Sequence, residues 1–335
     1  MNSMKQLLLF GLVVLLLLIL LPLIVFRGQD RSQGAGGREQ EIVTQAPVTT
    51  RGPQEIGVRE IDPARTINVM RQGSGEVEAI GMLEYLIGVV AAEMPALYHE
   101  EALKAQAVAG YTYARYRLEV AGAAALSDSG LTDQGYLCPQ QRREKWGTNS
   151  DVHEAKIEGA VRAVYGQALK YNDQPIFAAY HAISGGTTEN AGTYWGQEFS
   201  YLRSVDSAGC RLSPGFSITE TFSPDEMQAA LARFEGLQLG SGPAAWFGEP
   251  ERSDVGTVLA IDAGGQTLSG RQLREALDLR SSNFEIHFTG GAFQVKNSGY
   301  GHGVGMSQYG ADFMARQGSN YQEILKHYYP GTELV

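Results

Sequence analysis

The residue best suited to acid–base chemistry is Glu93, a carboxyl within the apolar run VVAAEMPA at 89–96. Removal from water disfavours the ionised form of a carboxyl and raises its pKa, as a general acid near neutral pH requires. Pro95 stops a helix and biases Met94 away from helical geometry, which places Glu93 at a helix end. Glu93 is a candidate general acid. The alternative is an ordinary helix-end glutamate exposed to solvent.

A first glycine-rich segment, YHAISGGTTEN at 180–190, follows a predicted strand. It groups hydrogen-bonding side chains around two glycines, which allow a backbone to approach a ligand closely. The segment lacks the G-x-S-x-G elbow of serine hydrolases, because Ala182 takes the first glycine position. It is a candidate binding loop, and the alternative is a turn whose hydroxyls bond their own backbone.

A second such segment, GYGHGVGMSQYGA at 299–311, contains five glycines and the polar residues His302, Ser307, Gln308 and Tyr309. It is not a phosphate loop, because it lacks the terminal Gly-Lys-Ser/Thr, and no dinucleotide-binding βαβ context surrounds it. An ordinary connection seldom needs so many glycines. We interpret it as a functional loop, with a structural hairpin exit as the alternative.

Two helices are predicted to carry or flank Glu93. Apolar residues recur with a helical period over 82–93, and a second helix, rich in Ala, is predicted over 100–120. On this second helix Lys104, Tyr111 and Arg115 fall in one narrow stripe. The default interpretation of such a stripe is a solvated helix face.

The remaining pattern is typical of an α+β domain with antiparallel hairpins and several helices. The domain is predicted to open with a hairpin that turns at 72–75, and another hairpin is predicted over 284–296, turning at Gly290 and Gly291. Further strands are predicted at 168–171, 176–181 and 254–262, and further helices at 153–164, 270–279, 304–316 and 321–328.

The N-terminus predicts a membrane anchor. Residues 7–26 carry no charge and are long enough to cross the hydrocarbon core. No small-residue cleavage site follows, so an uncleaved anchor is favoured over a signal peptide. The charges that flank the span give no clear orientation, and the motifs described above favour an external domain. Residues 1–6 are therefore predicted to be a cytoplasmic tip, 27–60 a flexible linker and 61–335 one extracytoplasmic domain.

Composition and cysteine usage narrow the possible partners. The chain has 27 Lys and Arg against 37 Asp and Glu, and so lacks the basic excess of a nucleic-acid binder. The two cysteines, Cys138 and Cys210, are compatible with a disulfide in an external compartment or with two unpaired buried thiols. No histidine lies within ten residues of Cys138, and no metal site is predicted.

Four separated blocks resemble the stage II sporulation protein D family. They are LEYLIGVVAAEMPA at 83–96 with EALKAQAVA at 101–109, the Tyr-His-x-x-Ser-Gly-Gly segment at 180–186, YLRSVD at 201–206 and GHGVGMSQYGA at 301–311. The resemblance covers residues 65–332 in the same order, together with the N-terminal anchor. Four ordered blocks make the resemblance specific.

This resemblance implies a membrane-anchored lytic transglycosylase of endospore formers that acts during engulfment of the forespore. Its substrate is glycan stripped of stem peptides, cleaved between N-acetylmuramic acid and N-acetylglucosamine to 1,6-anhydro products. The implied location is the mother-cell membrane, with the domain facing the intermembrane space. The implied partners are a sporulation amidase, protein P, and a membrane scaffold, protein M.

By resemblance, Glu93 is the catalytic residue, and the two glycine-rich segments line the glycan groove with Lys104. The predicted substrate contacts are Lys104, Tyr111, Arg115, Tyr180, His181, Ser184, Tyr201, His302, Ser307 and Gln308. The family usually has Arg at the position of Tyr111. Some relatives bind zinc through Cys and His near Cys138, but this chain lacks those histidines, so no metal or other cofactor is predicted.

The main alternative is a non-enzymatic domain that binds glycan and enhances a separate cell-wall amidase. Retention of Glu93 favours the enzyme. A purely structural tether between membranes is the weakest interpretation, because it leaves the polar glycine-rich segments without a role.

Overall fold

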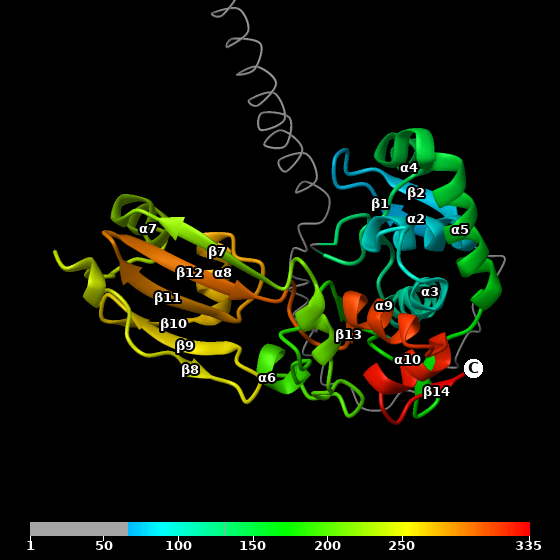
Figure 1. The fold of residues 1–335 in the computed structure, drawn as a ribbon. Helices are drawn as coiled ribbons and strands as arrows, with labels where there is room; N and C mark the ends of the chain where they lie inside the picture. The colour runs from blue at the N-terminus through cyan, green and yellow to red at the C-terminus, as the bar shows by residue number, and fades with distance from the viewer. Residues whose placement is uncertain (1–65, 131) are drawn as a thin grey trace, which may run out of the picture. The chain divides into compact units, whose positions relative to one another are not determined.

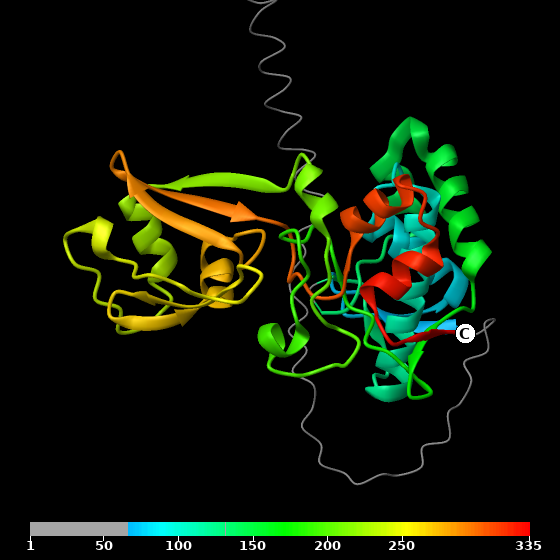
Figure 2. The same cartoon turned by 60° about the horizontal axis from the view of Figure 1, so that its bottom comes forward.

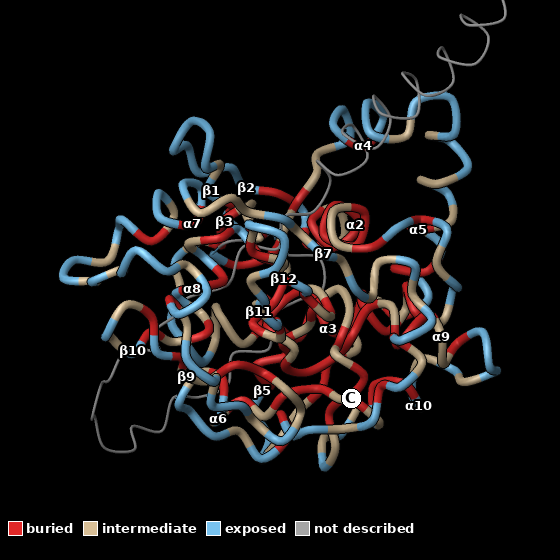
Figure 3. Tube along the Cα trace, turned by 60° about the vertical axis from the view of Figure 1, so that its left-hand side comes forward, coloured by how far each residue is buried: buried red, intermediate tan, exposed pale blue. Residues whose placement is uncertain are grey.

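Residues 66–130 and 132–335 are described by the computed structural model, and they form the predicted α+β fold. All of them belong to the unit Glu39–Val335. Their buried apolar side chains gather in two clusters, one built mainly from helices and one from antiparallel strands. Figure 3 shows that the helices of the first cluster, α2 (Met82–Glu93) and α3 (Glu100–Arg115), are mainly buried.

The helical cluster is assembled around α3. Helix α3 is rich in Ala, which allows α2 and α5 (Ser150–Val164) to pack closely against it. Two helices from the C-terminal end of the chain, α9 (Gln308–Arg316) and α10 (Tyr321–Tyr328), also contact α3 and lie beside it in Figures 1 and 2. The fold therefore brings α2 from the N-terminal part of the described chain and α9 and α10 from its C-terminal part together at one central helix.

Short strands frame this helical cluster. The sheet β2-β1-β3 contains the antiparallel hairpin β1 (Thr66–Met70) and β2 (Val77–Gly81), with β3 (Leu126–Ser127) parallel to β1. A second sheet orders β14 (Glu333–Leu334), β4 (Leu169–Tyr171) and β5 (Gln174–Pro175). The parallel pair β6 (Tyr180–His181) and β13 (Met306–Ser307) joins the two glycine-rich segments.

The second cluster is built from strands. Its first sheet orders β11 (Phe284–Thr289), β12 (Ala292–Ser298) and β7 (Ser217–Phe222), and its second orders β10 (Gln266–Ser269), β9 (Val258–Ala263) and β8 (Glu251–Arg252). Helices α7 (Pro224–Leu231) and α8 (Gly270–Leu277) supply further buried residues. Trp246 stacks on Phe293 inside this cluster.

Short helical elements complete the order. They are η1 (Tyr116–Val120), α4 (Pro139–Trp146), η2 (Gly147–Asn149), α6 (Ala191–Trp195), η3 (Ala208–Leu212) and η4 (Pro243–Ala245). Helix α4 is polar almost throughout, and its sequence gives no apolar period. Helix α7, by contrast, begins with a Ser223–Glu226 capping box and a proline at its first turn, a start signal present in the sequence.

Several predicted elements are confirmed. The helices at 82–93 and 321–328 have their predicted bounds, and the helix at 100–120 is observed as α3 continued by the π-helical turn η1. Both predicted hairpins are present, with turns at 71–76 and at Gly290 and Gly291. The predicted helix at 270–279 is observed as α8, which ends at Leu277.

Other predicted bounds were wrong. The strand predicted at 254–262 begins at Val258, because Gly256 adopts a positive φ of 94° in a turn. The helix predicted at 304–316 begins at Gln308, because residues 306 and 307 pair with β6. Of the strand predicted at 176–181, only Tyr180 and His181 belong to a strand, and the helix predicted at 153–164 already begins at Ser150. Helices α4, α6 and α7 and strand β7 were not predicted.

The described part of the chain bears on two further expectations. Over residues 66–130 and 132–335, no helix is both long and apolar enough to cross a membrane. The predicted anchor at 7–26 and linker at 27–60 lie outside the described residues. Cys138 and Cys210 are both free thiols, so they are unpaired as the second alternative expected, but only Cys210 is buried and Cys138 is half-buried.

Candidate functional site

Glu93 is the last residue of α2, and the chain turns directly after it. Met94 is extended, with φ −119° and ψ 144°, as expected before Pro95. The ammonium of Lys145, on α4, donates to the carbonyls of Ala91 at 2.8 Å and Ala92 at 3.4 Å. A cation at these last carbonyls complements the negative end of the helix dipole. The end of α2 is therefore fixed from outside by α4.

The carboxyl of Glu93 is surrounded by donors from three other segments. The backbone N–H of Gly135 donates to Glu93 Oε1 at 2.6 Å. The side chains of Tyr180 and Gln308 also hydrogen-bond to the carboxyl. The site therefore joins α2 with the 132–137 loop and with one residue from each glycine-rich segment.

A second layer of amides orients these donors. Tyr180 Oη donates to Gln134 Oε1 at 3.0 Å, and Gln134 Nε2 donates to Tyr85 Oη at 3.1 Å and to the Gly110 carbonyl at 3.3 Å. Gln308 Nε2 lies 3.4 Å from Gln106 Oε1, and Gln106 Nε2 is buried without a partner. Most polar atoms around Glu93 are thus fixed as either hydrogen-bond donors or acceptors by their neighbours.

Burial raises the pKa of Glu93 to about 7. The Gly135 N–H, the Gln308 and Tyr180 side chains and the positive charge of Lys145 oppose this rise, because each favours the carboxylate. Burial also raises the pKa of Tyr180 well above its usual value. Tyr180 is therefore a neutral donor, and Glu93 is a carboxyl that can hold or release a proton near neutral pH.

The 132–137 loop is anchored on both sides of Gly135. The buried carboxylate of Asp133 accepts from Tyr113 Oη at 3.1 Å and from the Ser127 N–H at 2.8 Å, and it pairs with Arg117. Beyond Gly135, Tyr136 stacks on Tyr85 with ring centroids 5.7 Å apart. These contacts hold the Gly135 N–H against Glu93.

Gly135 has little room for a side chain. A Cβ at this position would lie 3.1 Å from Glu93 Oε1 and 3.2 Å from Ala92 Cβ. The close approach of the loop to the carboxyl therefore depends on glycine.

Helix α3 presents a different face to the site from the one predicted. The α3 residues that connect to the Glu93 network are Gln106, Gly110 and Tyr113, and Arg117 of η1 joins them through Asp133. At 100° per residue this face lies about 150° from the stripe of Lys104, Tyr111 and Arg115. The stripe shares one face, as predicted, but that face is turned away from the face that carries the Glu93 network.

The solvated interpretation of that stripe was also wrong. Tyr111 is buried and lies against Tyr165, and Arg115 is buried and pairs with Glu119 at 2.8 Å. Lys104 forms ion pairs of 2.8 Å with Glu100 and Glu101. All three have partners in the packed helical cluster, where C-terminal helices cover α3.

His181 and His302 lie next to the site but face another way. Successive residues of a strand point to opposite sides, so Tyr180 faces Glu93 while His181 lies beside His302, with ring centroids 5.6 Å apart. His181 Nδ1–H donates to the Val304 carbonyl at 3.1 Å, which leaves Nε2 as an acceptor, buried and without a partner. Burial lowers the pKa of His181 to about 4 and that of His302 well below its usual value. Both rings are neutral near pH 7.

A small hollow lies beyond this pair. Its volume is about 330 Å³ when its opening to solvent is included. The lining combines residues of both glycine-rich segments, such as Glu189 and His302, with the polar residues Thr257, Ser282 and Asn283. Glu189 accepts from Ser253 Oγ at 2.6 Å, which ties the two segments to the strand-built cluster.

Ser184, Ser307 and Tyr201 have internal roles. Ser307 Oγ lies 3.1 Å from Cys210 Sγ and accepts from the Ser184 and Gly310 N–H groups, each at 3.3 Å. Tyr201 is buried, and its Oη accepts from the Phe177 N–H at 3.1 Å. These hydroxyls connect backbone segments to one another.

Of the sequence-predicted residues, the structure brings together Glu93, Tyr180 and Gln308. Sequence reasoning missed Gln106, Gln134, Gly135 and Lys145. Gln134 and Gly135 lie in a loop without a periodic pattern, and Lys145 lies on the polar helix α4. Only the isolated glycine at 135 hinted at a close backbone approach.

Within residues 66–130 and 132–335, no group of three or more His, Cys, Asp or Glu side chains is placed to hold a metal ion. What the described arrangement offers is one titratable carboxyl with neutral donors around it. Such a carboxyl and its hydrogen-bond donors are suited to proton transfer to and from a single bound group.

Comparison with known proteins places this arrangement in a family. The family model described as "Stage II sporulation protein" matches residues 70–171, which include Glu93 and Gly135. The chain is 37% identical to the stage II sporulation protein D of Bacillus subtilis (strain 168), over 99% of this chain and 96% of that relative. It is 39% identical to the protein of the same name from Bacillus amyloliquefaciens, over 98% and 94% of the two chains.

A more distant similarity concerns a protein with another name. The chain is 27% identical to an amidase enhancer of Bacillus subtilis (strain 168), over 75% of this chain and 40% of that relative. The similarity therefore spans most of the present chain but less than half of the enhancer.

Proposed function

We propose, from the premise that this chain belongs to the stage II sporulation protein D family, that it is a sporulation-specific lytic transglycosylase. Its substrate would be peptidoglycan strands stripped of stem peptides. The observation that carries the proposal is the carboxyl of Glu93, whose pKa is raised to about 7 among neutral donors.

The first chemical step needs a proton donor at the glycosidic oxygen between N-acetylmuramic acid and N-acetylglucosamine. With a pKa of about 7, roughly half of the Glu93 side chains are protonated at neutral pH. Proton transfer from Glu93 to this oxygen assists cleavage of the bond and leaves Glu93 as a carboxylate. The charge that develops on the sugar is oxocarbenium-like.

The second step returns the proton. The Glu93 carboxylate accepts the proton of the C6 hydroxyl of the muramic ring, and that oxygen attacks its own anomeric carbon to close a 1,6-anhydro bond. No water is consumed, so the second carboxylate of ordinary glycoside hydrolysis is not required. The Gly135, Tyr180 and Gln308 donors favour the carboxylate that exists between the two steps.

The cellular setting forms part of the proposal. Residues 7–26 would anchor the protein in the mother-cell membrane, with the domain at 61–335 facing the intermembrane space. The sporulation amidase, protein P, would strip the stem peptides, and the scaffold, protein M, would hold both proteins. Family membership and the apolar N-terminus support this arrangement.

A second candidate function is non-enzymatic enhancement of a cell-wall amidase. The similarity to the Bacillus subtilis amidase enhancer over 75% of this chain favours it. In that case the domain binds glycan without breaking it. The tuned Glu93 side chain favours the enzyme.

Analysis of reaction products separates the two functions. The full-length protein in detergent is incubated with peptide-free glycan strands, beside the variants Glu93→Gln and Glu158→Gln. Glu158 is a solvent-facing glutamate on α5 paired with Arg162, and it serves as the matched control. We expect mass spectrometry to find 1,6-anhydro-muramic ends with the wild type and Glu158→Gln but not with Glu93→Gln.

Each other result has a definite meaning. Anhydro products from Glu93→Gln contradict the assignment of Glu93. Reducing ends from the wild type indicate a hydrolase with a second carboxylate. Bound but uncut glycan supports the amidase-enhancer function.

A further inference from the structure

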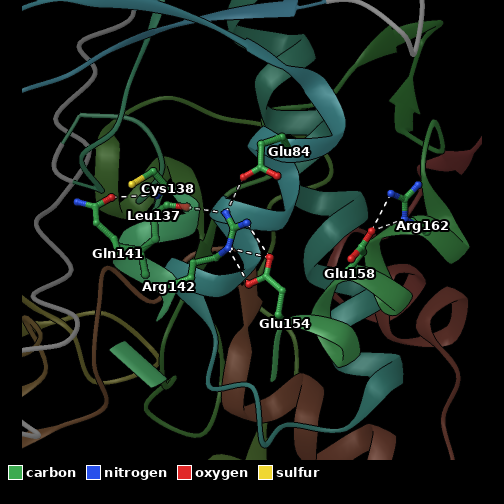
Figure 4. Close-up of polar contacts among 8 residues, drawn as sticks. All are labelled: Glu84, Leu137, Cys138, Gln141, Arg142, Glu154, Glu158 and Arg162. Carbon is green, nitrogen blue, oxygen red and sulfur yellow. Dashed lines mark hydrogen bonds and ion pairs between the residues drawn. The ribbon is translucent and has the colours of Figure 1, made fainter. Parts of the chain in front are cut away.

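Arg142 is a buried cation that makes several charged hydrogen bonds close to the Glu93 site. It lies on α4, and its exposed fraction is 1%. Its guanidinium binds Glu154 of α5 through Nε at 2.9 Å and Nη2 at 2.7 Å, and Glu84 of α2 through Nη1 at 2.8 Å (Figure 4). One side chain thus ties three helices together.

The same guanidinium also holds the loop that binds Glu93. Arg142 Nη1 donates to the Leu137 carbonyl at 2.9 Å (Figure 4). The Leu137 N–H in turn donates to the Gly88 carbonyl at 3.2 Å. Leu137 is two residues from Gly135, whose N–H donates to Glu93 Oε1. The loop is therefore fixed on α2 through Arg142 immediately after the contact with Glu93.

Helix α4 makes a second connection, one turn further along. Lys145 donates to the Ala91 and Ala92 carbonyls, directly before Glu93. Two residues of one short helix therefore hold the two segments that meet at the Glu93 carboxyl. Arg142 holds the 132–137 loop, and Lys145 holds the end of α2. We propose that Arg142 is a positioning residue for Glu93, holding α4 and the 132–137 loop so that the Gly135 N–H and the Lys145 ammonium meet the end of α2.

The partners of Arg142 indicate that its role is geometric more than stabilising. The side chains of Glu84 and Glu154 are 38% and 30% exposed. If Arg142 is removed, water can solvate both carboxylates, so no buried charge is left unpaired. A methionine of similar length fills the space of the aliphatic stem. We therefore expect Arg142→Met to fold.

Loss of Arg142 should be detected at Glu93. The groups that act on the Glu93 carboxyl are Gly135 and Lys145, which α4 holds, and Tyr180 and Gln308, which other segments carry. Tyr85, from α2 itself, adds a neutral phenol nearby. If α4 and the loop relax, the carboxylate loses the Gly135 donor and part of the field of Lys145, and its pKa rises.

The test compares Arg142→Met with Arg162→Met. Arg162 lies on α5 and pairs with Glu158 at the surface, away from Arg142 in the same view (Figure 4). Each full-length variant carries ¹³C-labelled glutamate, and the Glu93 carboxyl signal is identified by its absence in Glu93→Gln. We expect the Glu93 titration midpoint to rise by about 0.5 pH unit or more in Arg142→Met and to stay unchanged in Arg162→Met.

Enzyme kinetics give the second measurement, which rests on the proposed function. In Arg142→Met we expect kcat for peptide-free glycan to fall about tenfold with KM within about twofold, and the alkaline limb of the pH profile to move up with the titration. The NMR titration needs no turnover, so it tests the inference even if the proposed reaction fails.

Glu154→Gln is the milder variant if Arg142→Met does not fold, because it leaves Arg142 bound to Glu84 and Leu137. It should raise the Glu93 midpoint in the same direction by a smaller amount. A fall in melting temperature with an unchanged Glu93 titration, in either variant, would show that Arg142 is only structural and would overturn the inference.

Discussion

At the scale of single residues, the central observation is that Glu93 faces donors that favour its charged form, while burial favours its neutral form. The balance is a pKa of about 7. Tyr180 is the most informative of these donors, because its single hydroxyl proton can be given either to Glu93 or to Gln134 Oε1. A carboxylate attracts that proton, whereas a carboxylic acid leaves it to Gln134.

Removal of the Tyr180 hydroxyl should therefore disturb the carboxylate selectively. We expect Tyr180→Phe to raise the pKa of Glu93, to move the alkaline limb of kcat/KM to higher pH and to lower kcat by about 10- to 100-fold, since a charge-assisted hydrogen bond is worth about 1.5–3 kcal/mol. The measurement is the pH profile of glycan cleavage.

The matched control is Tyr321→Phe. Tyr321 Oη also donates to a glutamine Oε1, that of Gln167, at 3.0 Å, but it lies on α10. An unchanged pH profile in Tyr180→Phe, or an equal change in both variants, would contradict a specific role for Tyr180.

At the scale of elements, helix ends and helix faces could be predicted from the sequence, because both are determined by residues close together in the chain. Pro95 ends α2, so its C-terminal residue Glu93 could be located from the sequence. The stripe of Lys104 and Tyr111 was also found, because helical periodicity groups residues by face. Which partner covers each face depends on contacts with α9 and α10 from the far end of the chain, and periodicity contains no such information.

The contact between α2 and the 132–137 loop gives a stability test at this scale. In the middle of a helix, Ala is favoured over Gly by about 1 kcal/mol. A Cβ on Gly88 would nevertheless lie too close to the ring of Tyr136 and to the Leu137 carbonyl. We expect Gly88→Ala to destabilise the protein by about 1–3 kcal/mol through overpacking, and to reduce cleavage, because the displaced loop carries Gly135. Urea unfolding measures the first effect.

Gly159→Ala is the control for this change. Gly159 lies in α5, and a Cβ there would meet no atom within 4 Å. This variant should be more stable than the wild type by about 0.5–1 kcal/mol. If Gly88→Ala were equally stabilising, the loop would be free to move away from α2, and the close contact would not restrain Gly135.

At the scale of the whole molecule, the site joins segments that are distant in sequence. Residues 93, 135, 180 and 308 meet at one carboxyl. Resemblance predicted 93, 180 and 308 because they lie in recognisable blocks. Residue 135 was not predicted, because its contact is made by a backbone N–H, and a single glycine in a loop without a periodic pattern does not identify the partner of that N–H. The acid–base function that we propose for Glu93 thus depends on packing between segments that are distant in sequence. Burial also shifts the pKa values of ionisable side chains, so the stability of the fold depends on pH.

His181 and His302 change the pH dependence of folding stability in one direction, and Glu93 changes it in the other. Burial lowers the pKa of His181 to about 4 and raises that of Glu93 to about 7. Between pH 4 and 6.5 the unfolded chain binds more protons at His181, so this group favours folding as pH rises. The low pKa of His302 acts in the same direction. Between about pH 4.5 and 7 the native state holds the extra proton at Glu93, so this group disfavours folding as pH rises.

Glu93→Gln isolates the glutamate contribution, because glutamine keeps the shape of the acid but does not ionise. Below pH 4.5 the carboxyl is protonated in both native and unfolded states, and the two proteins should be similarly stable. Above pH 7 the wild type carries a desolvated carboxylate, and the variant should be more stable by on the order of 1–3 kcal/mol, after allowance for partial solvent exposure. That difference corresponds to a melting temperature about 5 °C higher for a domain of this size.

The measurement is the melting temperature of wild type, Glu93→Gln and Glu158→Gln from pH 4 to pH 8.5. The gap between Glu93→Gln and wild type should open between about pH 4.5 and pH 7 and stay constant above pH 7, whereas the solvent-facing Glu158 should produce no such gap. A gap that is constant with pH would mean that Glu93 is not desolvated in the folded protein. A gap that opens with pH in a catalytically inactive variant would show that the fold gives up stability at the residue that we propose transfers the proton.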